Sequence, residues 1–185
     1  MKTYISILRG INVGGKKKII MAELAKLYEE LKFLNVTTYI QSGNVIFNSD
    51  SNISNKSISE LIVNAIVKKY AFDVPVLVRA IDEFENIIKL NPFISQKDID
   101  LEKLHVTFLE DEPAKEKTDK IKSLDDFSPD KFIIIEKEIY LYCPVDNGST
   151  KLSNIFFESK LKVKATTRNW KTVNKLFELA ALKQA

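Results

Sequence analysis

The sequence predicts an α+β protein made of two ferredoxin-like (split βαβ) units, each with an antiparallel sheet and an added helix. Short β-rich segments alternate with segments whose apolar residues recur every three or four positions, as on one face of a helix. The order β-α-β-β-α-β occurs twice along the 185 residues, and this is the order of the ferredoxin-like unit. A composition of 45% hydrophobic and 29% charged residues excludes a disordered or fibrous chain. We therefore predict two domains of about equal size, residues 1–92 and 93–185.

Turn and cap residues place several element ends in the first half. Ser42-Gly43 separates two β-type runs, and glycine supplies the positive φ that a tight hairpin needs. Ser57-Ile58-Ser59-Glu60 has the spacing of a capping box, which opens a helix. Pro75 indicates a strand start or a sheet edge. The predicted elements are strand Thr3–Leu8, helix 21–31, strands Val36–Gln41 and Asn44–Phe47, a helix from Ser57, strand Val74–Arg79 and helix Ile81–Leu90.

The second half repeats this element order without visible similarity of the residues themselves. Its predicted elements are strand Leu104–Leu109, a charged helix Pro113–Leu124, strands Phe132–Ile135 and Ile139–Cys143, helix Lys151–Leu161, strand Lys162–Thr166 and helix Thr172–Leu182. With right-handed crossovers, the strands of each unit take the spatial order 4-1-3-2 and all pair antiparallel.

This topology predicts one polar cluster at a sheet end in each unit. In the first unit, the loop after strand one meets the hairpin, which brings residues 9–18 close to residues 41–44. In the second unit, the ends of strands three and four meet the start of strand one. Residues 146–151, residues 166–170 and His105 are then neighbours. Loops at such sheet ends commonly carry function.

Composition limits the environment of the protein. The lone cysteine, Cys143, excludes an internal disulfide and favours a reducing, cytoplasmic location. No apolar run approaches the ~18 residues that span a bilayer, and the N-terminus has too short an apolar core for a signal peptide. A net charge of +3 is only mildly basic and indicates no particular partner. With one histidine and one cysteine, we predict no metal site.

Five motifs stand out in chain order. They are Leu8-Arg9-Gly10-Ile11-Asn12-Val13-Gly14-Gly15-Lys16, Thr38-Tyr39-Ile40-Gln41-Ser42-Gly43-Asn44-Val45, Asn91-Pro92-Phe93, Leu104-His105-Val106-Thr107-Phe108-Leu109 and Ala165-Thr166-Thr167-Arg168-Asn169-Trp170-Lys171-Thr172-Val173. Together they resemble the bacterial family catalogued as domain of unknown function 1697, over nearly the whole chain. The resemblance implies paired ferredoxin-like units and assigns no activity. The family tends to have a basic residue within the segment that here reads Gly148-Ser149-Thr150-Lys151-Leu152, so an anion site there would be weaker in this chain.

The first cluster nearly contains a phosphate-binding loop. Gly10 to Lys17 follows G-x-x-x-x-G-K, but Lys17 replaces the hydroxyl that would hold Mg²⁺, and an antiparallel sheet is wrong for nucleotide triphosphatases. Backbone N–H groups and lysines at a helix start can still hold an anion, although a glycine turn with solvated lysines explains the same residues. The hairpin amides also suit a turn without any ligand. The predicted ligand-binding residues are Arg9, Asn12, Gly14, Gly15, Lys16, Gln41, Ser42 and Asn44.

The second cluster combines a predicted helix start with an arginine. Gly148 to Lys151 opens a helix in this interpretation, so its amides suit a phosphate or carboxylate, although a simple N-cap explains them too. Arg168 is one of three arginines among 28 basic residues, and its planar guanidinium suits oxyanions. The predicted ligand-binding residues here are Gly148, Lys151, Thr167, Arg168, Asn169 and Trp170.

His105 is the predicted general acid–base residue, because an unperturbed imidazole titrates nearest to neutral pH. Alternation predicts that Leu104, Val106 and Phe108 face the helices, together with Ile139, Leu141 and Cys143. His105 and Cys143 then lie on opposite faces of the sheet, which argues against a Cys–His pair. The same alternation places His105, Thr107, Tyr140, Tyr142, Thr166 and Arg168 together on the face away from the helices.

These observations favour a cytoplasmic protein that binds, or acts on, a small anionic or phosphorylated ligand. His105, Lys151 and Arg168 would form one site, and Arg9 with Lys16 a second or shared one. One alternative is a nucleic-acid-binding module that stacks bases on Tyr140 and Tyr142 of an open sheet face. Another is an interaction domain without chemistry. No cofactor is indicated by the residues.

Overall fold

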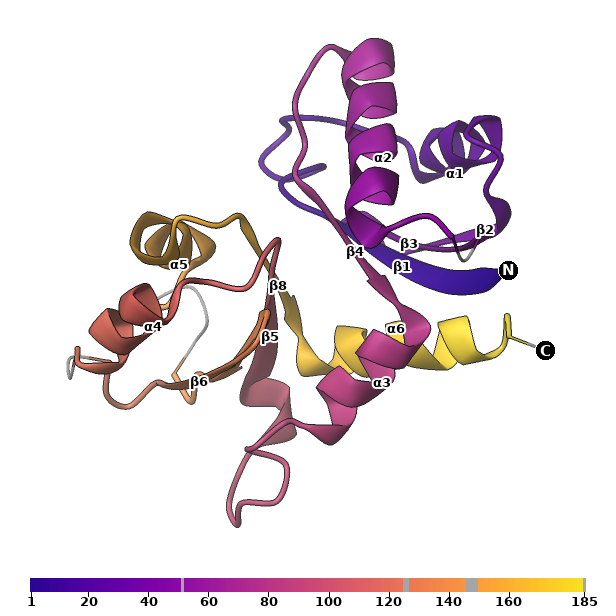
Figure 1. The fold of residues 1–185 in the computed structure, drawn as a ribbon. Helices are drawn as coiled ribbons and strands as arrows, with labels where there is room; N and C mark the ends of the chain where they lie inside the picture. The colour runs from indigo at the N-terminus through magenta and orange to yellow at the C-terminus, as the bar shows by residue number, and fades with distance from the viewer. Residues whose placement is uncertain (51, 125–126, 146–149, 185) are drawn as a thin grey trace. The chain divides into compact units, whose positions relative to one another are not determined.

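The structure is a computed structural model that describes residues 1–50, 52–124, 127–145 and 150–184. In these residues the chain forms six α-helices and eight strands, and the strands build two four-stranded antiparallel sheets (Figure 1). The predicted α+β class is therefore confirmed. The chain groups into two compact units, one of Met1–Asn86 with Lys175–Ala185 and one of Ile87–Asn174. Compactness does not test independent folding, so the predicted domains 1–92 and 93–185 stay a prediction.

The first sheet has the strand order β2-β3-β1-β4, which agrees with the predicted order. β1 pairs antiparallel with both β3 and β4, and β2 pairs with β3. The elements of this part of the chain are β1 (Lys2–Leu8), α1 (Met21–Glu30), β2 (Leu34–Tyr39), β3 (Asn44–Ser49), α2 (Asn55–Tyr70), β4 (Val76–Ala80) and α3 (Ile81–Lys89).

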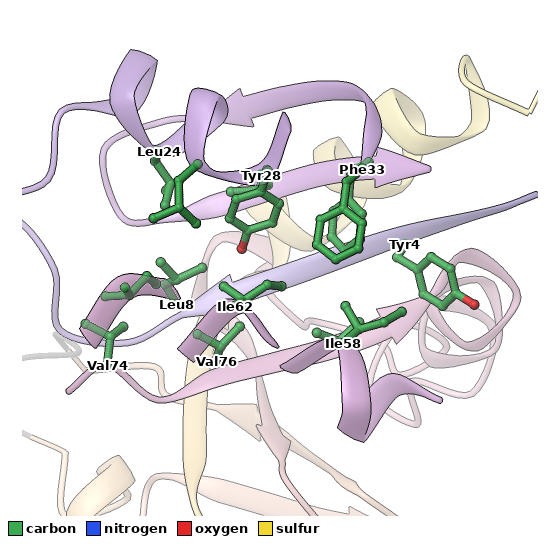
Figure 2. Close-up of a cluster of buried hydrophobic side chains, with 14 of the residues drawn as sticks. Tyr4, Leu8, Leu24, Tyr28, Phe33, Ile58, Ile62, Val74 and Val76 are labelled. Atoms are coloured by element: carbon green, nitrogen blue, oxygen red, sulfur yellow. The ribbon is translucent and has the colours of Figure 1, made fainter. Parts of the chain in front are cut away.

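One face of the first sheet packs against α1 and α2 through a core of apolar side chains. Figure 2 shows this core, in which Tyr28 of α1, Ile62 of α2 and Leu8 of β1 lie close together. The Tyr28 hydroxyl lies 2.7 Å from the hydroxyl of Ser6, so both buried polar groups are satisfied. Burial and this polar contact therefore fix which side of β1 faces the helices.

The second sheet has the strand order β6-β7-β5-β8, again all antiparallel. The elements of this part of the chain are a 3-10 turn at Leu101–Lys103, β5 (Leu104–Leu109), α4 (Lys115–Lys122), β6 (Lys131–Ile135), β7 (Glu138–Tyr142), α5 (Asn154–Leu161), β8 (Ala165–Asn169) and α6 (Trp170–Ala181). Of all helices described, the longest has 16 residues, and none combines the length and apolar character of a membrane span.

The register of the second sheet corrects the predicted face of β5. The core under α4 and α5 contains Leu109, Ile139, Leu141 and Cys143. His105 pairs with Leu141 and Thr107 with Ile139, and directly opposed residues share a face. His105 and Thr107 therefore face α4 and α5. The prediction for Leu104, Val106 and Phe108 was wrong because all six residues of β5 are buried, so hydrophobicity does not distinguish its two faces.

Two helix starts also differ from the sequence prediction. Ser54 caps α2 by accepting a hydrogen bond from the Ser57 N–H at 3.1 Å, so the predicted capping box at Ser57 is wrong. Ser153 caps α5 by accepting from the Phe156 N–H at 3.2 Å. Each stretch offers several serines, and any of them suits an N-cap, so composition alone does not select the start.

Candidate functional site

The loop between β1 and α1 is the most basic glycine-rich segment of the first unit. We call residues 9–18 the basic loop: it carries Arg9, Lys16, Lys17 and Lys18 and has no acidic residue. Its backbone is unusual, because positive φ occurs at Gly10, Asn12, Gly14, Gly15 and Lys17. The three lysines are exposed. The basic loop thus presents positive charge to solvent from a backbone that few other sequences adopt.

The Asn12 side chain bonds both the end of the basic loop and the neighbouring hairpin. Its side-chain Nδ2 donates to the carbonyl of Ile19 at 2.9 Å and to the carbonyl of Gln41 at 3.0 Å. Its Oδ1 accepts from the Ile19 N–H at 2.9 Å. The amide therefore closes the loop on itself and ties it to the β2–β3 hairpin. This confirms that the loop and the hairpin meet at one sheet end, and it gives Asn12 a structural use.

The residues of the β2–β3 hairpin pack against the start of the basic loop and the end of β1. Gly43 has φ +78°, and a Cβ built on it would lie 2.7 Å from Leu8 Cβ and from Ile11 Cδ1. The Gly43 carbonyl accepts from the Leu8 N–H at 2.8 Å. Asn44 is buried, and its Nδ2 donates to the Tyr39 carbonyl and to Ser42 Oγ, both at 3.1 Å. The Asn44 amide therefore satisfies turn groups, as the alternative interpretation of the sequence expected.

The lysines stand before the helix rather than on it. α1 begins at Met21, and its N-cap, Ile20, makes no side-chain capping bond. The Lys16 N–H donates to the Val13 carbonyl at 3.1 Å, which closes a small turn at the loop tip. The Lys17 ammonium donates to the carbonyl of Asp73. Lys16 and Lys18 are therefore the exposed lysines of the basic loop on which an anion site would depend.

The predicted helix start in the second cluster is wrong. α5 begins at Asn154, so residues 148–151 precede the helix and its cap. Gly148 lies outside the described residues, and Lys151 is exposed. Thr150 instead organises the backbone: its hydroxyl donates to Asp130 Oδ2 at 2.5 Å and accepts from the Leu152 N–H at 3.0 Å. The helix-dipole argument for an anion at this place no longer applies.

Arg168 and His105 lie on opposite faces of the second sheet. Arg168 pairs with Val106 across the ladder, whereas His105 pairs with Asn169. The Arg168 guanidinium donates to the carbonyl of Thr167 at 2.9 Å, and burial lowers its pKa to about 10. It is therefore still charged at neutral pH. The register does not bring Arg168 together with His105 into one site.

The other predicted residues of this strand have structural contacts. The Asn169 side chain accepts from the Thr172 N–H at 2.8 Å and so caps α6. Trp170 begins α6 and is 7% exposed. Thr167 donates to Asn154 of α5 at 2.7 Å and lies 2.6 Å from the hydroxyl of Thr107. The sequence analysis missed this partly buried chain of Thr107, Thr167 and Asn154, because it placed Thr107 on the other face.

His105 and Cys143 share a face, contrary to the prediction. Burial lowers the pKa of His105 below 6.5, and its Nδ1 lies 3.2 Å from the Lys103 carbonyl. Burial, reinforced by the nearby Asp130 charge, raises the pKa of Cys143 to about 11, and its thiol donates to Thr150 Oγ1 at 3.9 Å. A protonated thiol is a poor nucleophile, so chemistry rather than geometry argues against a Cys–His pair. In the described chain, no three His, Cys, Asp or Glu side chains gather as metal ligands.

The tyrosines of β7 are not both available for stacking. Tyr140 is 1% exposed, and its hydroxyl donates to the Ile87 carbonyl at 3.0 Å. Burial raises its pKa well above the usual range of tyrosine. Tyr142 is half-buried, with the Phe93 ring centroid 6.3 Å away. A base therefore has no access to Tyr140, on which the nucleic-acid alternative depends.

The comparisons with known proteins identify the family. The sequence matches the family described as Protein of unknown function (DUF1697) over residues 1–140. The structure is similar to that of the conserved bacterial protein SP0830 from Streptococcus pneumoniae, with a TM-score of 0.73 and 24% identity over 98% of this chain and 99% of that chain. No curated protein matches the sequence. The family match covers well over half of the 185 residues, so the chain belongs to the DUF1697 family.

Proposed function

We propose that the protein binds a small anionic ligand, one that carries a phosphate or a carboxylate, at the basic loop. The observation that carries this proposal is the three hydrogen bonds of Asn12, which hold a loop of four basic residues in one shape. A loop fixed before binding loses less conformational freedom when the ligand arrives, which favours affinity. The neighbouring hairpin adds Gln41 and Ser42 as polar groups for specificity.

The charge and backbone of the loop suit an anion. Lys16 and Lys18 are exposed, and no acidic residue lies between Arg9 and Met21 to neutralise them. Gly14 and Gly15 both have positive φ and form the turn that the Lys16 N–H closes on the Val13 carbonyl, and turn amides of this kind can bind an anion. A ligand with two or more negative charges therefore meets both lysine ammonium groups and backbone donors.

The second cluster supports the proposal less well. Arg168 and His105 are divided between two faces, and Lys151 does not begin a helix. Any ligand role of Lys151, Thr167, Arg168, Asn169 or Trp170 stays a prediction, as does the acid–base role of His105. We also infer that both units are ferredoxin-like, supported by the repeated element order and the strand order, and that the protein is cytoplasmic, supported by its lone cysteine.

Thermal unfolding with pyrophosphate tests the proposal. At about 100 times its Kd, a ligand stabilises the folded state by about 2.7 kcal/mol, which raises the Tm of a protein of this size by about 5–10 °C. We expect that rise in the wild type and its loss in the double variant Lys16→Gln, Lys18→Gln.

A matched control separates binding from net charge. Lys68 and Lys69 are exposed lysines of α2, so Lys68→Gln with Lys69→Gln removes the same charge elsewhere on the first unit. The control should keep the full rise in Tm. An equal loss in both double variants, or no rise for the wild type, contradicts the proposal.

A further inference from the structure

The four edge strands of the two sheets differ in how their outward backbone groups are satisfied. β2 and β4 are the edges of the first sheet, and β6 and β8 are the edges of the second. An unpaired edge is a template for another strand, and natural proteins usually block it. The blocking devices can be followed strand by strand, because the ladder registers fix which residues point outward.

Side chains block the outward groups of β4. The Arg9 N–H donates to the Pro75 carbonyl. In this register the backbone groups of odd-numbered β4 residues bond β1, and those of even-numbered residues point outward from the sheet. The outward Val76 carbonyl accepts from Ser59 Oγ at 2.6 Å, and the outward Val78 carbonyl from Arg79 at 3.1 Å. The outward Ala80 N–H donates to Glu83 at 2.7 Å.

β8 is blocked in the same manner. The Glu110 N–H donates to the Lys164 carbonyl, so the backbone N–H and carbonyl groups of Ala165 and Thr167 point outward from the sheet. The Ala165 N–H donates to Glu158 at 3.0 Å, and the Thr167 carbonyl accepts from Arg168 at 2.9 Å. Arg79 and Arg168 thus make equivalent contacts in the two units, each to the carbonyl of the residue before it.

β2 is blocked by irregularity instead. Its register with β3 shifts between Leu34 and Thr37, and Asn35 has a positive φ of 52°. The Lys183 ammonium donates to the outward-lying Asn35 carbonyl at 2.6 Å. A strand that is bent and bonded in this way cannot extend a regular ladder.

β6 has none of these devices within the described chain. Its five residues pair with β7 in an unbroken register, from Lys131 with Tyr142 to Ile135 with Glu138. The Cys143 N–H donates to the Lys103 carbonyl, and the Leu109 N–H donates to the Lys137 carbonyl. The backbone groups of odd-numbered β7 residues therefore bond β5, and those of even-numbered residues bond β6. The inward residues of β6 are then Lys131, Ile133 and Ile135. The N–H and carbonyl groups of Phe132 and Ile134 point outward.

After the exposed Lys131 at its start, β6 is apolar. Residues 132–135 read Phe-Ile-Ile-Ile, and all but Ile134 are half-buried rather than buried. The outward groups of Phe132 and Ile134 make no hydrogen bond to a side chain of the described residues. A regular, apolar strand with two open donors and two open acceptors is the arrangement that protein edges normally avoid.

We propose that β6 pairs antiparallel with β6 of a second copy of this chain, about a two-fold axis at Ile133. In this register Phe132 of one copy lies opposite Ile134 of the other, and the reverse, so all four outward groups of each strand find partners. The two Ile133 residues then face each other as a non-hydrogen-bonded pair. The occupant is a second copy because the strand is complementary to itself in both hydrogen bonding and apolar side chains.

Sedimentation equilibrium over a concentration series tests the self-association. The wild type should form a dimer that Ile133→Lys weakens by about tenfold or more, because two ammonium groups would then face each other across the axis. The matched control is Thr37→Lys on the blocked edge β2, which should leave the dimer unchanged. Thermal unfolding of each variant checks that it is folded. A monomer at all concentrations, or equal weakening by both variants, overturns the proposal.

Cross-linking tests the register itself. Non-hydrogen-bonded pairs have Cα atoms about 4.5 Å apart, which lies within the range that a disulfide spans. Both variants are oxidised mildly and compared by non-reducing denaturing electrophoresis. Ile133→Cys should form a covalent dimer, whereas Thr37→Cys should stay monomeric. A covalent dimer of the Thr37 variant without one of the Ile133 variant would instead indicate a contact through β2.

Discussion

The same kind of sheet end is assembled differently in the two units. At the basic loop, one amide joins the segments: Asn12 bonds both Ile19 and Gln41, so loop and hairpin form one surface. At the corresponding end of the second unit, the neighbouring strand residues His105 and Arg168 point to opposite faces. Topology brings segments together, but side-chain parity and individual polar contacts decide which groups share a site.

Replacing Gly43 should lower the free energy of unfolding more than any other change at the sheet end of the basic loop. Gly43→Ala forces a left-handed φ on a residue with a Cβ and places that Cβ 2.7 Å from Leu8 and Ile11. Strain and overpacking together should cost about 2–4 kcal/mol of unfolding free energy, measured by urea unfolding. The control is Gly14→Ala, where no atom lies within 4 Å of the added Cβ, so only about 1 kcal/mol of strain is expected. Equal costs at both positions would contradict the close packing of the hairpin.

Removing the Asn12 amide should loosen the loop. Asn12→Ala deletes three hydrogen bonds, which together are worth about 1–3 kcal/mol, and trypsin should then cut more rapidly after Lys16 to Lys18. Asn169→Ala is the comparison in the second unit, because it removes one helix cap worth about 1 kcal/mol. That variant should leave cleavage of the basic loop unchanged. If it accelerates the same cleavage, Asn12 has no local effect.

Cys143 should be unreactive while the protein is folded. Its pKa of about 11 makes the thiolate fraction at pH 8 about a hundredfold smaller than at an ordinary value of 9. Labelling with a thiol reagent should therefore follow unfolding in urea. Because the folded pKa is raised, the contribution of Cys143 to the free energy of unfolding should be constant below pH 9 and should fall as pH rises towards 11. Rapid labelling in native buffer at pH 8 would restore the Cys–His alternative.

His105 should make the smallest contribution, and only in acid. Burial lowers its folded pKa, so the unfolded chain takes up a proton near pH 6.5 before the folded chain does. The free energy of unfolding should therefore fall as pH drops below about 6.5. His105→Gln should lessen this dependence, as measured by urea unfolding at pH 7 and pH 5. The same slope in both proteins would mean that the imidazole is solvated like a free one.

Much of the fold follows from the sequence, because periodic hydrophobic residues and turn glycines act locally. The hairpin at Ser42-Gly43, the strand order and the core position of Cys143 were all predicted and are present. The faces of β5 were not predicted correctly, since every residue of a buried strand is hidden and alternation carries no signal. Helix starts at Ser54 and Ser153 were missed because several serines compete. The hydrogen bond of Asn12 to Gln41 joins residues 29 positions apart, so only the structure reveals it.

Anion binding at the basic loop is the central claim, and the glycines report on it most directly. The chain has five glycines, of which Gly10, Gly14 and Gly15 belong to the basic loop, while Gly148 belongs to the other predicted cluster. A protein labelled with ¹⁵N-glycine therefore gives a simple amide spectrum that distinguishes the two places during a pyrophosphate titration. The account predicts saturable shifts of Gly10, Gly14 and Gly15 with Gly148 unmoved. A shift of Gly148 alone, or no shift of any glycine, would contradict it.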